Sequence, residues 1–166
     1  MTFAANQGDH SNVYLKEAVM ETVTAVENLS TDQQLALLWV IYQALGSSIT
    51  SVPPGPARLF LTGGLLLQIK QMSQLEQLRV MRELVIRVNT PITRQYGMFS
   101  EKTKLAFWSQ LFEWMCTGEV IVLPNDYKLS PASEKIFKQI ASLDFNEQIA
   151  VLRHIVVNMG IDPLAN

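Results

Sequence analysis

The sequence predicts an all-α protein with seven to nine helices. Three segments share one helix-start pattern, and three further segments place a capping residue before a proline or a helix-forming run. Only the short stretch EVIVL, residues 119–123, suggests a strand, and no long segment alternates apolar and polar residues. Helices are therefore expected to form the whole architecture.

The shared helix-start pattern covers residues 29–38, 72–81 and 143–152. In each copy an apolar residue precedes Ser or Asp, and Gln or Glu follows three positions later. This is the spacing of a capping box, in which the two side chains satisfy backbone N–H groups at the helix start. The three pairs are Ser30 with Gln33, Ser73 with Glu76, and Asp144 with Glu147.

A glutamine follows each capping box, at positions 34, 77 and 148, and its methylenes offer only a weak contact to the apolar residue before the box. The first and third copies lead to Gly46 and Gly160, which are both expected to cap helices at their C-terminal ends. The sequence leaves open whether these copies descend from a duplication or share one solution to the same packing problem.

Further helices are expected to begin at Thr90-Pro91, at Ser100 and at Ser130-Pro131. Two connectors rich in proline, glycine and turn-forming residues lie at 47–57 and 120–131. The second connector is expected to join two helical subdomains.

The composition favours a soluble protein of a reducing, intracellular compartment. Hydrophobic residues make up 48% of the chain and charged residues 17%, against about a quarter in average proteins. The single Cys116 excludes an internal disulfide. The longest apolar run spans about 16 Å as a helix, against roughly 30 Å of bilayer hydrocarbon, and residues 1–12 do not have the pattern of a signal peptide.

A formal net charge of -2 argues against nucleic acid as a partner, although the charge is unevenly spread. Between residues 79 and 104 the basic side chains outnumber the acidic ones, Glu83 and Glu101. This basic flank fits a solvated helix face and, as the weaker alternative, a surface that docks an acidic protein. Its cations are Arg79, Arg82, Arg87, Arg94, Lys102 and Lys104.

The sequence offers little for catalysis or for metal binding. It has no G-x-S-x-G elbow, no P-loop, no dinucleotide-binding glycine pattern and no CxxC or HxxxH ligand pair. Aromatic and thioether neighbours of Cys116 favour a buried structural thiol with a raised pKa, and His154 is expected to be a packed or surface residue. The chain is therefore not expected to be an enzyme.

Large apolar side chains form four stripes at helical spacing, and these are the main candidates for a binding site. The stripes are Leu35, Leu38, Trp39 and Tyr42; Leu78, Met81 and Val85; Leu105, Trp108, Phe112 and Met115; and Ile149, Leu152 and Val156. Periodicity alone favours an ordinary core. Polarizable and flat aromatic groups also suit the lining of a long apolar ligand, and Arg153 is an unusual member of an apolar stripe.

Five strings resemble, in order and approximate spacing, the N-terminal domain of the cyanobacterial orange carotenoid protein. They are DQQLALLWVIYQALG, NTPITRQY, KLAFW, YKLS and QIAVLRHIVVNMG. The resemblance runs from about Leu29 to Gly160, and residues 1–28 are less similar. It implies one carotenoid-binding domain over residues 1–166, folded as two interleaved helical bundles. It also implies a noncovalently bound keto-carotenoid such as canthaxanthin or echinenone between the bundles.

The resemblance also assigns positions. Trp39, Tyr42 and Trp108 would surround the end ring of the pigment. Arg153 matches an arginine that bridges to the C-terminal domain in two-domain relatives, and Ser109 replaces an aromatic residue of those relatives. The polyene would be lined by Leu35, Leu38, Met81, Leu105, Phe112, Met115, Leu123, Tyr127, Ile149 and Val156. On the opening helix, Leu37, Ile41 and Ala44 would instead pack against protein.

The family resemblance implies photoprotection. The first expectation is a quencher of singlet oxygen that dissipates excitation energy as heat, and the second is a constitutive quencher that docks on the phycobilisome. The implied partners are the carotenoid, the phycobilisome and a separate carrier protein similar to the C-terminal domain. The implied location is the cytoplasm, in association with phycobilisomes at the thylakoid surface. A different class of function is a helical interaction module without pigment.

Overall fold

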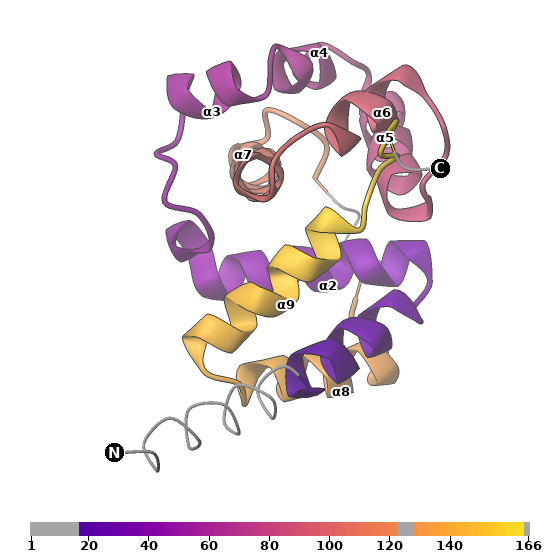
Figure 1. The fold of residues 1–166 in the computed structure, drawn as a ribbon, viewed down its shortest axis with the longest axis vertical. Helices are drawn as coiled ribbons and strands as arrows, with labels where there is room; N and C mark the ends of the chain where they lie inside the picture. Colours follow the sequence, from indigo (N-terminus) through magenta and orange to yellow (C-terminus); the bar gives the residue numbers. More distant parts are fainter. Residues whose placement is uncertain (1–16, 123–127, 165–166) are drawn as a thin grey trace.

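The computed structural model describes residues 17–122 and 128–164, and within these ranges helices are the regular secondary structure (Figure 1). The predicted all-α fold is thereby confirmed. The stretch EVIVL, which suggested a strand, forms none in its described part. Residues 119–122 belong to neither a helix nor a strand. Val120 and Ile121 are nevertheless buried there, so their apolar character serves the core.

The chain begins its described part with helical residues 17–27. The elements that follow are α2 (Thr31–Leu45), the 3-10 helix η1 (Gly46–Ile49), α3 (Pro56–Leu61), α4 (Leu65–Lys70), α5 (Gln74–Ile86), α6 (Pro91–Gly97), α7 (Glu101–Thr117), α8 (Pro131–Ala141) and α9 (Phe145–Val157). The expected helix starts at Thr90, Ser100 and Ser130 are all N-caps in the structure.

The helices form two groups that are interleaved along the chain (Figure 1). Residues 17–27, α2, α8 and α9 lie in one group, and α3 to α6 lie around α7 in the other. The chain starts in the first group, passes through the second and returns. Helix α7 packs against α9, and α2 packs against α5, so one hydrophobic core runs across both groups.

The three predicted capping boxes are present. Each cap side chain accepts a hydrogen bond from the backbone N–H three residues on, and each Gln or Glu side chain accepts one from the backbone N–H of the cap. For the third box the two distances are 2.8 Å and 3.2 Å. Local sequence therefore determines where these three helices begin.

The glutamine after each box has a function that the expected weak apolar contact did not describe. Its side-chain amide donates to carbonyl groups at the end of the preceding helix or in the turn. The same corner therefore occurs three times. The distances are 3.0 Å from Gln34 Nε2 to Leu29 O, 3.0 Å from Gln77 Nε2 to Ile69 O, and 3.1 Å from Gln148 Nε2 to Ile140 O.

The two expected glycine caps differ. Gly46 is the C-cap of α2, as predicted, whereas α9 is capped by Asn158, so the prediction for Gly160 is wrong. The backbone N–H of Gly160 instead donates to the carbonyl of Leu84 at 2.9 Å, and an added Cβ at residue 160 would lie 2.6 Å from the Tyr96 ring. Gly160 is therefore required by a close approach between segments.

Candidate functional site

An aromatic cluster bridges α2 and α7. Trp39 and Tyr42 lie three residues apart on α2, with ring centroids 6.3 Å apart. Phe112 of α7 lies 5.2 Å from Tyr42 and 5.5 Å from Trp108, which is one turn earlier on α7. Trp39 and Tyr42 are partly exposed, while Phe112 and Trp108 are buried. The cluster therefore leads from the surface into the core.

Trp108 is fixed by a polar contact inside the core. Its indole Nε1 donates to the phenol oxygen of Tyr96 at 3.0 Å, and the Tyr96 hydroxyl donates to the carbonyl of Val156 in α9. Complete burial raises the pKa of the Tyr96 phenol, an effect that the hydrogen bond from Trp108 reduces in part. Tyr96 therefore remains neutral and joins α6, α7 and α9 at one point.

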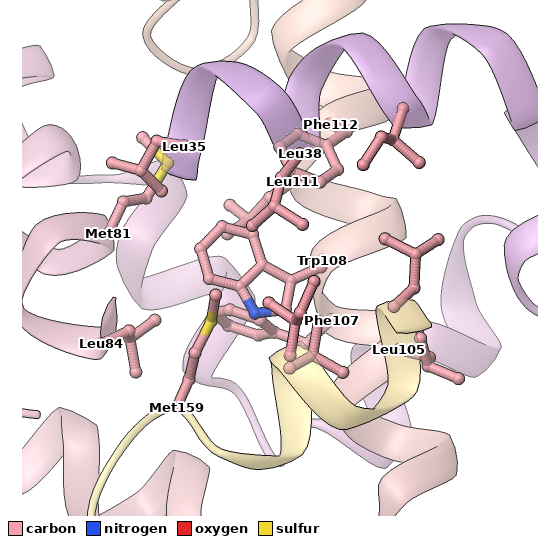
Figure 2. Packing of buried hydrophobic residues seen from close by; sticks show 14 of the residues in the cluster. Leu35, Leu38, Met81, Leu84, Leu105, Phe107, Trp108, Leu111, Phe112 and Met159 are labelled. Atoms are coloured by element: carbon pink, nitrogen blue, oxygen red, sulfur yellow. The ribbon is translucent and has the colours of Figure 1, made fainter. Parts of the chain in front are cut away.

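Trp108 belongs to a cluster of buried aliphatic, aromatic and methionine side chains, of which Figure 2 shows Leu38, Met81 and Met159 among others. Leu35, Leu38 and Met81 are each exposed by at most 2%. Such polarizable, closely packed groups favour dispersion contacts with an apolar ligand as well as with one another.

A small cavity lies where α2, η1, α7 and α9 meet. Its volume is about 10 Å³, at the lower limit for holding one water molecule, so the side chains around it lie close together. The lining is Leu38, Ile49, Leu105, Trp108, Ser109, Phe112, Leu152 and Val156.

A groove of about 240 Å³ opens at the surface beside this cavity. Ile49 and Leu105 line both, so the two hollows are neighbours. The other side chains of the groove come from the loop after η1 and from the adjoining ends of α7 and α9. They are Thr50, Ser51, Glu101, Lys102, Ile149 and Arg153.

Arg153 lies on the lip of this groove. Its side chain is about half exposed at 49%, and its Nε lies 3.9 Å from a carboxylate oxygen of Glu101. The guanidinium therefore reaches water and an acid, which explains how an arginine can occupy a stripe whose other members face the core.

Most of the expected lining residues belong to one hydrophobic cluster, but Leu35, Met81 and Met115 line neither the cavity nor the groove. Trp39, Tyr42 and Ile149 are partly buried, and Leu123 and Tyr127 lie outside the described residues. Ala44, expected to pack against protein beside Leu37 and Ile41, is exposed. The expected lining residues that are buried are Leu35, Leu38, Met81, Leu105, Trp108, Phe112, Met115 and Val156.

Sequence reasoning did not single out Ile49 or Tyr96 individually. Ile49 lines both hollows but belongs to a 3-10 turn, outside any apolar stripe. Tyr96 follows the Thr90 capping box by six residues, and no periodic signal distinguishes it from a surface tyrosine. Only the approach of α6 to α7 and α9 gives it a role.

The prediction of a buried Cys116 is wrong, because the thiol is exposed near the end of α7. Its pKa is nonetheless raised, by residual desolvation and by the nearby Glu113 carboxylate, so the thiol is not activated. His154 is an exposed residue of α9, one of the two places expected for it.

The basic flank does not form one exposed cationic surface. Arg82 makes a bidentate ion pair with Asp32, with an Nε to Oδ1 distance of 2.8 Å. Lys104 is buried, and its Nζ donates to the carbonyl of Val157 at 3.1 Å. Desolvation accordingly lowers the pKa of Lys104. Arg82 and Lys104 therefore use their positive charges in contacts within the protein.

No helix in the described ranges is both long and apolar enough to span a membrane. Over the same residues, His, Cys, Asp and Glu side chains form no group of three that could hold a metal ion. The apolar cavity, the adjoining groove and the aromatic cluster share lining residues and form the candidate site.

Comparisons with known proteins point to carotenoid-binding relatives. Residues 12–162 match the family described as "Orange carotenoid protein, N-terminal". An orange carotenoid-binding domain-containing protein of Nostoc sp. is 50% identical over 150 residues, which are 90% of this chain and 88% of that protein. The orange carotenoid-binding protein of Limnospira maxima is 39% identical over 88% of this chain, and the chain spans 46% of its length.

Solved structures agree with these sequence matches. The Anabaena orange carotenoid protein binding canthaxanthin superposes with a TM-score of 0.81 at 40% identity, over 88% of this chain and 46% of that one. The Anabaena red carotenoid protein binding canthaxanthin superposes with a TM-score of 0.75 at 34% identity, over 86% of this chain and 97% of that one. The fold of two interleaved helical groups is therefore shared with carotenoid-binding proteins.

Proposed function

The chain belongs to the family of the orange carotenoid protein N-terminal domain, and from this premise we propose that it binds a keto-carotenoid noncovalently for photoprotection. The pigment is canthaxanthin or echinenone, and the protein quenches singlet oxygen and dissipates excitation energy as heat. The described residues act as one binding domain, and no residue is required for catalytic turnover.

The single observation that carries this proposal is that the surface groove, the small apolar cavity and the aromatic cluster adjoin one another and so mark out a path between the helices. The surface groove adjoins the small cavity through Ile49 and Leu105, and the cavity adjoins the aromatic cluster through Trp108 and Phe112. A rod-shaped, apolar molecule with a ring at each end matches a path that has a wide mouth and an aromatic end.

The side chains that line the cavity fit such a pigment by their chemistry. The cavity itself must widen to hold it. Because the cavity holds only about 10 Å³, the side chains of α2, α7 and α9 must separate when the pigment enters. The apolar walls offer no competing polar partner, apart from one serine hydroxyl, and the two groups of helices meet along this seam. Pigment would therefore replace contacts between apolar side chains with contacts of the same kind.

When bound, the conjugated polyene supplies low-lying excited states that accept energy and release it as heat. The protein holds and orients it. Trp39, Tyr42 and Trp108 stack on an end ring, and the Tyr96 hydroxyl keeps the Trp108 indole in one orientation. The partly exposed rings of Trp39 and Tyr42 keep that end near dissolved oxygen.

The test is expression of the protein in a host that makes canthaxanthin and echinenone. A purified protein with bound pigment, and with a higher rate of singlet-oxygen quenching than the same protein without pigment, supports the proposal. A colourless protein contradicts it and favours the interaction module without pigment.

A pair of tryptophan variants tests the location of the pigment. Trp108→Ser should reduce the pigment yield or shift the visible spectrum, because it removes both packing and ring stacking. The control is Trp114→Ser on the same helix, since Trp114 is also buried but lies against Lys70 rather than on the cavity. An unchanged spectrum and yield in Trp108→Ser would show that the pigment lies elsewhere.

The second candidate function is constitutive quenching of the phycobilisome. The half-exposed Arg153 on the lip of the groove favours it, because a cation at the mouth can meet an acidic antenna protein or a pigment carrier similar to the C-terminal domain. The cytoplasmic face of the thylakoid is the corresponding location. Mixing pigment-loaded protein with isolated phycobilisomes tests this candidate, and unchanged phycobilisome fluorescence would eliminate it.

A further inference from the structure

One polar group on the wall of the apolar cavity has no partner. Ser109 of α7 is 2% exposed and lines the cavity next to Trp108. Its Oγ is the one buried side-chain oxygen or nitrogen, among the residues that the structure describes, without a hydrogen bond. Buried hydroxyl groups are nearly always paired, because an unpaired one has lost its bonds to water.

The cavity itself offers no partner for this hydroxyl. Six of the other lining side chains are aliphatic or phenyl groups, and the indole N–H of Trp108 is already bonded to Tyr96. A donor on the wall of an apolar cavity in a binding path can be satisfied by an acceptor on the ligand. An oxygen on a carotenoid ring is such an acceptor, whereas the ring of β-carotene has none.

We propose that the Ser109 hydroxyl donates a hydrogen bond to an oxygen on the carotenoid ring that lies against Trp108, and that Ser109 thereby selects pigments with an oxygenated ring. The inference rests on the proposed function, since it needs a carotenoid in this path. Ser109 is placed for this role because it adjoins Trp108, which stacks on the ring, and lines the same cavity as Phe112. A ring without oxygen leaves the hydroxyl unpaired, so such a pigment binds less tightly.

The competing explanation is local. A serine inside a helix can turn its hydroxyl to the carbonyl four residues earlier, here that of Leu105, and would then not interact with the pigment. The two explanations differ in what happens when the hydroxyl is removed, because only the first makes pigment preference depend on it.

The experiment is a competition between two pigments. Pigment-free wild-type protein, Ser109→Ala and Ser109→Thr are each offered equal amounts of canthaxanthin and β-carotene, and the bound pigments are extracted and quantified. We expect the wild type to prefer canthaxanthin and Ser109→Ala to lose roughly 3- to 10-fold of that preference, the effect of one hydrogen bond. Ser109→Thr keeps a hydroxyl and should retain the preference in part.

A second readout is the carbonyl stretching band of bound canthaxanthin in vibrational spectra. It should move to higher frequency in Ser109→Ala, because the carbonyl loses a hydrogen bond. Ser109→Ala should fold at least as stably as the wild type without pigment, since it removes an unpaired buried hydroxyl.

The outcomes distinguish a failure of the inference about Ser109 from a failure of the proposed function. An unchanged pigment ratio and an unchanged carbonyl band in a pigment-loaded Ser109→Ala variant overturn the inference alone. A wild-type protein that takes up neither pigment contradicts the proposed function, and the inference with it.

Discussion

The indole Nε1 of Trp108 donates to the phenol oxygen of Tyr96 at 3.0 Å, deep inside the core. The Tyr96 hydroxyl in turn donates a hydrogen bond to the carbonyl of Val156 in α9. A residue of a short helix thus fixes both the aromatic group proposed to hold the pigment ring and the helix that faces it.

Tyr96→Phe should destabilise the protein by about 1–3 kcal/mol, because the Trp108 N–H and the Val156 carbonyl both lose a buried partner. Urea unfolding of the pigment-free protein measures this. The variant should also shift the absorption of the bound pigment, since the indole is no longer held in one orientation. A loss of stability without any spectral change would show that Tyr96 serves the fold alone.

Alkaline pH should weaken the wild type through the same tyrosine. Burial raises the pKa of the folded-state phenol above its ordinary value of 10.0, so the unfolded chain releases this proton first. Stability is then fully present below about pH 10 and falls above it, by up to about 1.4 kcal/mol per pH unit. Unfolding measured from pH 9 to pH 11.5 should show a shallower loss in Tyr96→Phe. Equal slopes would contradict this origin of the alkaline loss.

Gln77→Ala should destabilise the protein by about 2–4 kcal/mol. Its amide donates to the carbonyl of Ile69 at 3.0 Å, and its Oε1 accepts from the backbone N–H of Ile121 at 2.8 Å, so it joins the end of α4 to the segment after α7. The matched control is Gln74→Ala, an exposed glutamine at the start of the same helix. Similar midpoints in urea for both variants would show that the buried hydrogen bonds contribute little.

Gly160→Ala should cost at least about 2 kcal/mol more than Gly118→Ala. Both glycines have a positive φ, 72° and 77°, so both variants bear the same backbone cost of about 1–2 kcal/mol. Only the Cβ at residue 160 meets the Tyr96 ring, at 2.6 Å, while the Cβ at residue 118 meets nothing within 4 Å. Thermal unfolding of the two variants gives the difference, and equal losses would mean that the Tyr96 ring moves away without cost.

The sequence by itself determined where α2, α5, α6, α7, α8 and α9 begin. Ser30, Ser73 and Asp144 are followed at the right spacing by Gln or Glu, and this signal is complete within four residues because capping is a contact between near neighbours. The apolar stripes likewise placed Trp108 and Phe112 on one face of α7, since helical spacing brings side chains four residues apart together, and both line the cavity.

Only the tertiary structure decided which groups meet across elements. It directs Arg153 to Glu101 and water, leaves Cys116 exposed, and gives Tyr96 its partners in α7 and α9. These outcomes depend on how α6, α7 and α9 approach one another, and a stripe on a single helix contains no information about the neighbour it will face. Capping could therefore be predicted from local sequence, whereas the polar contacts that fix the candidate site could not.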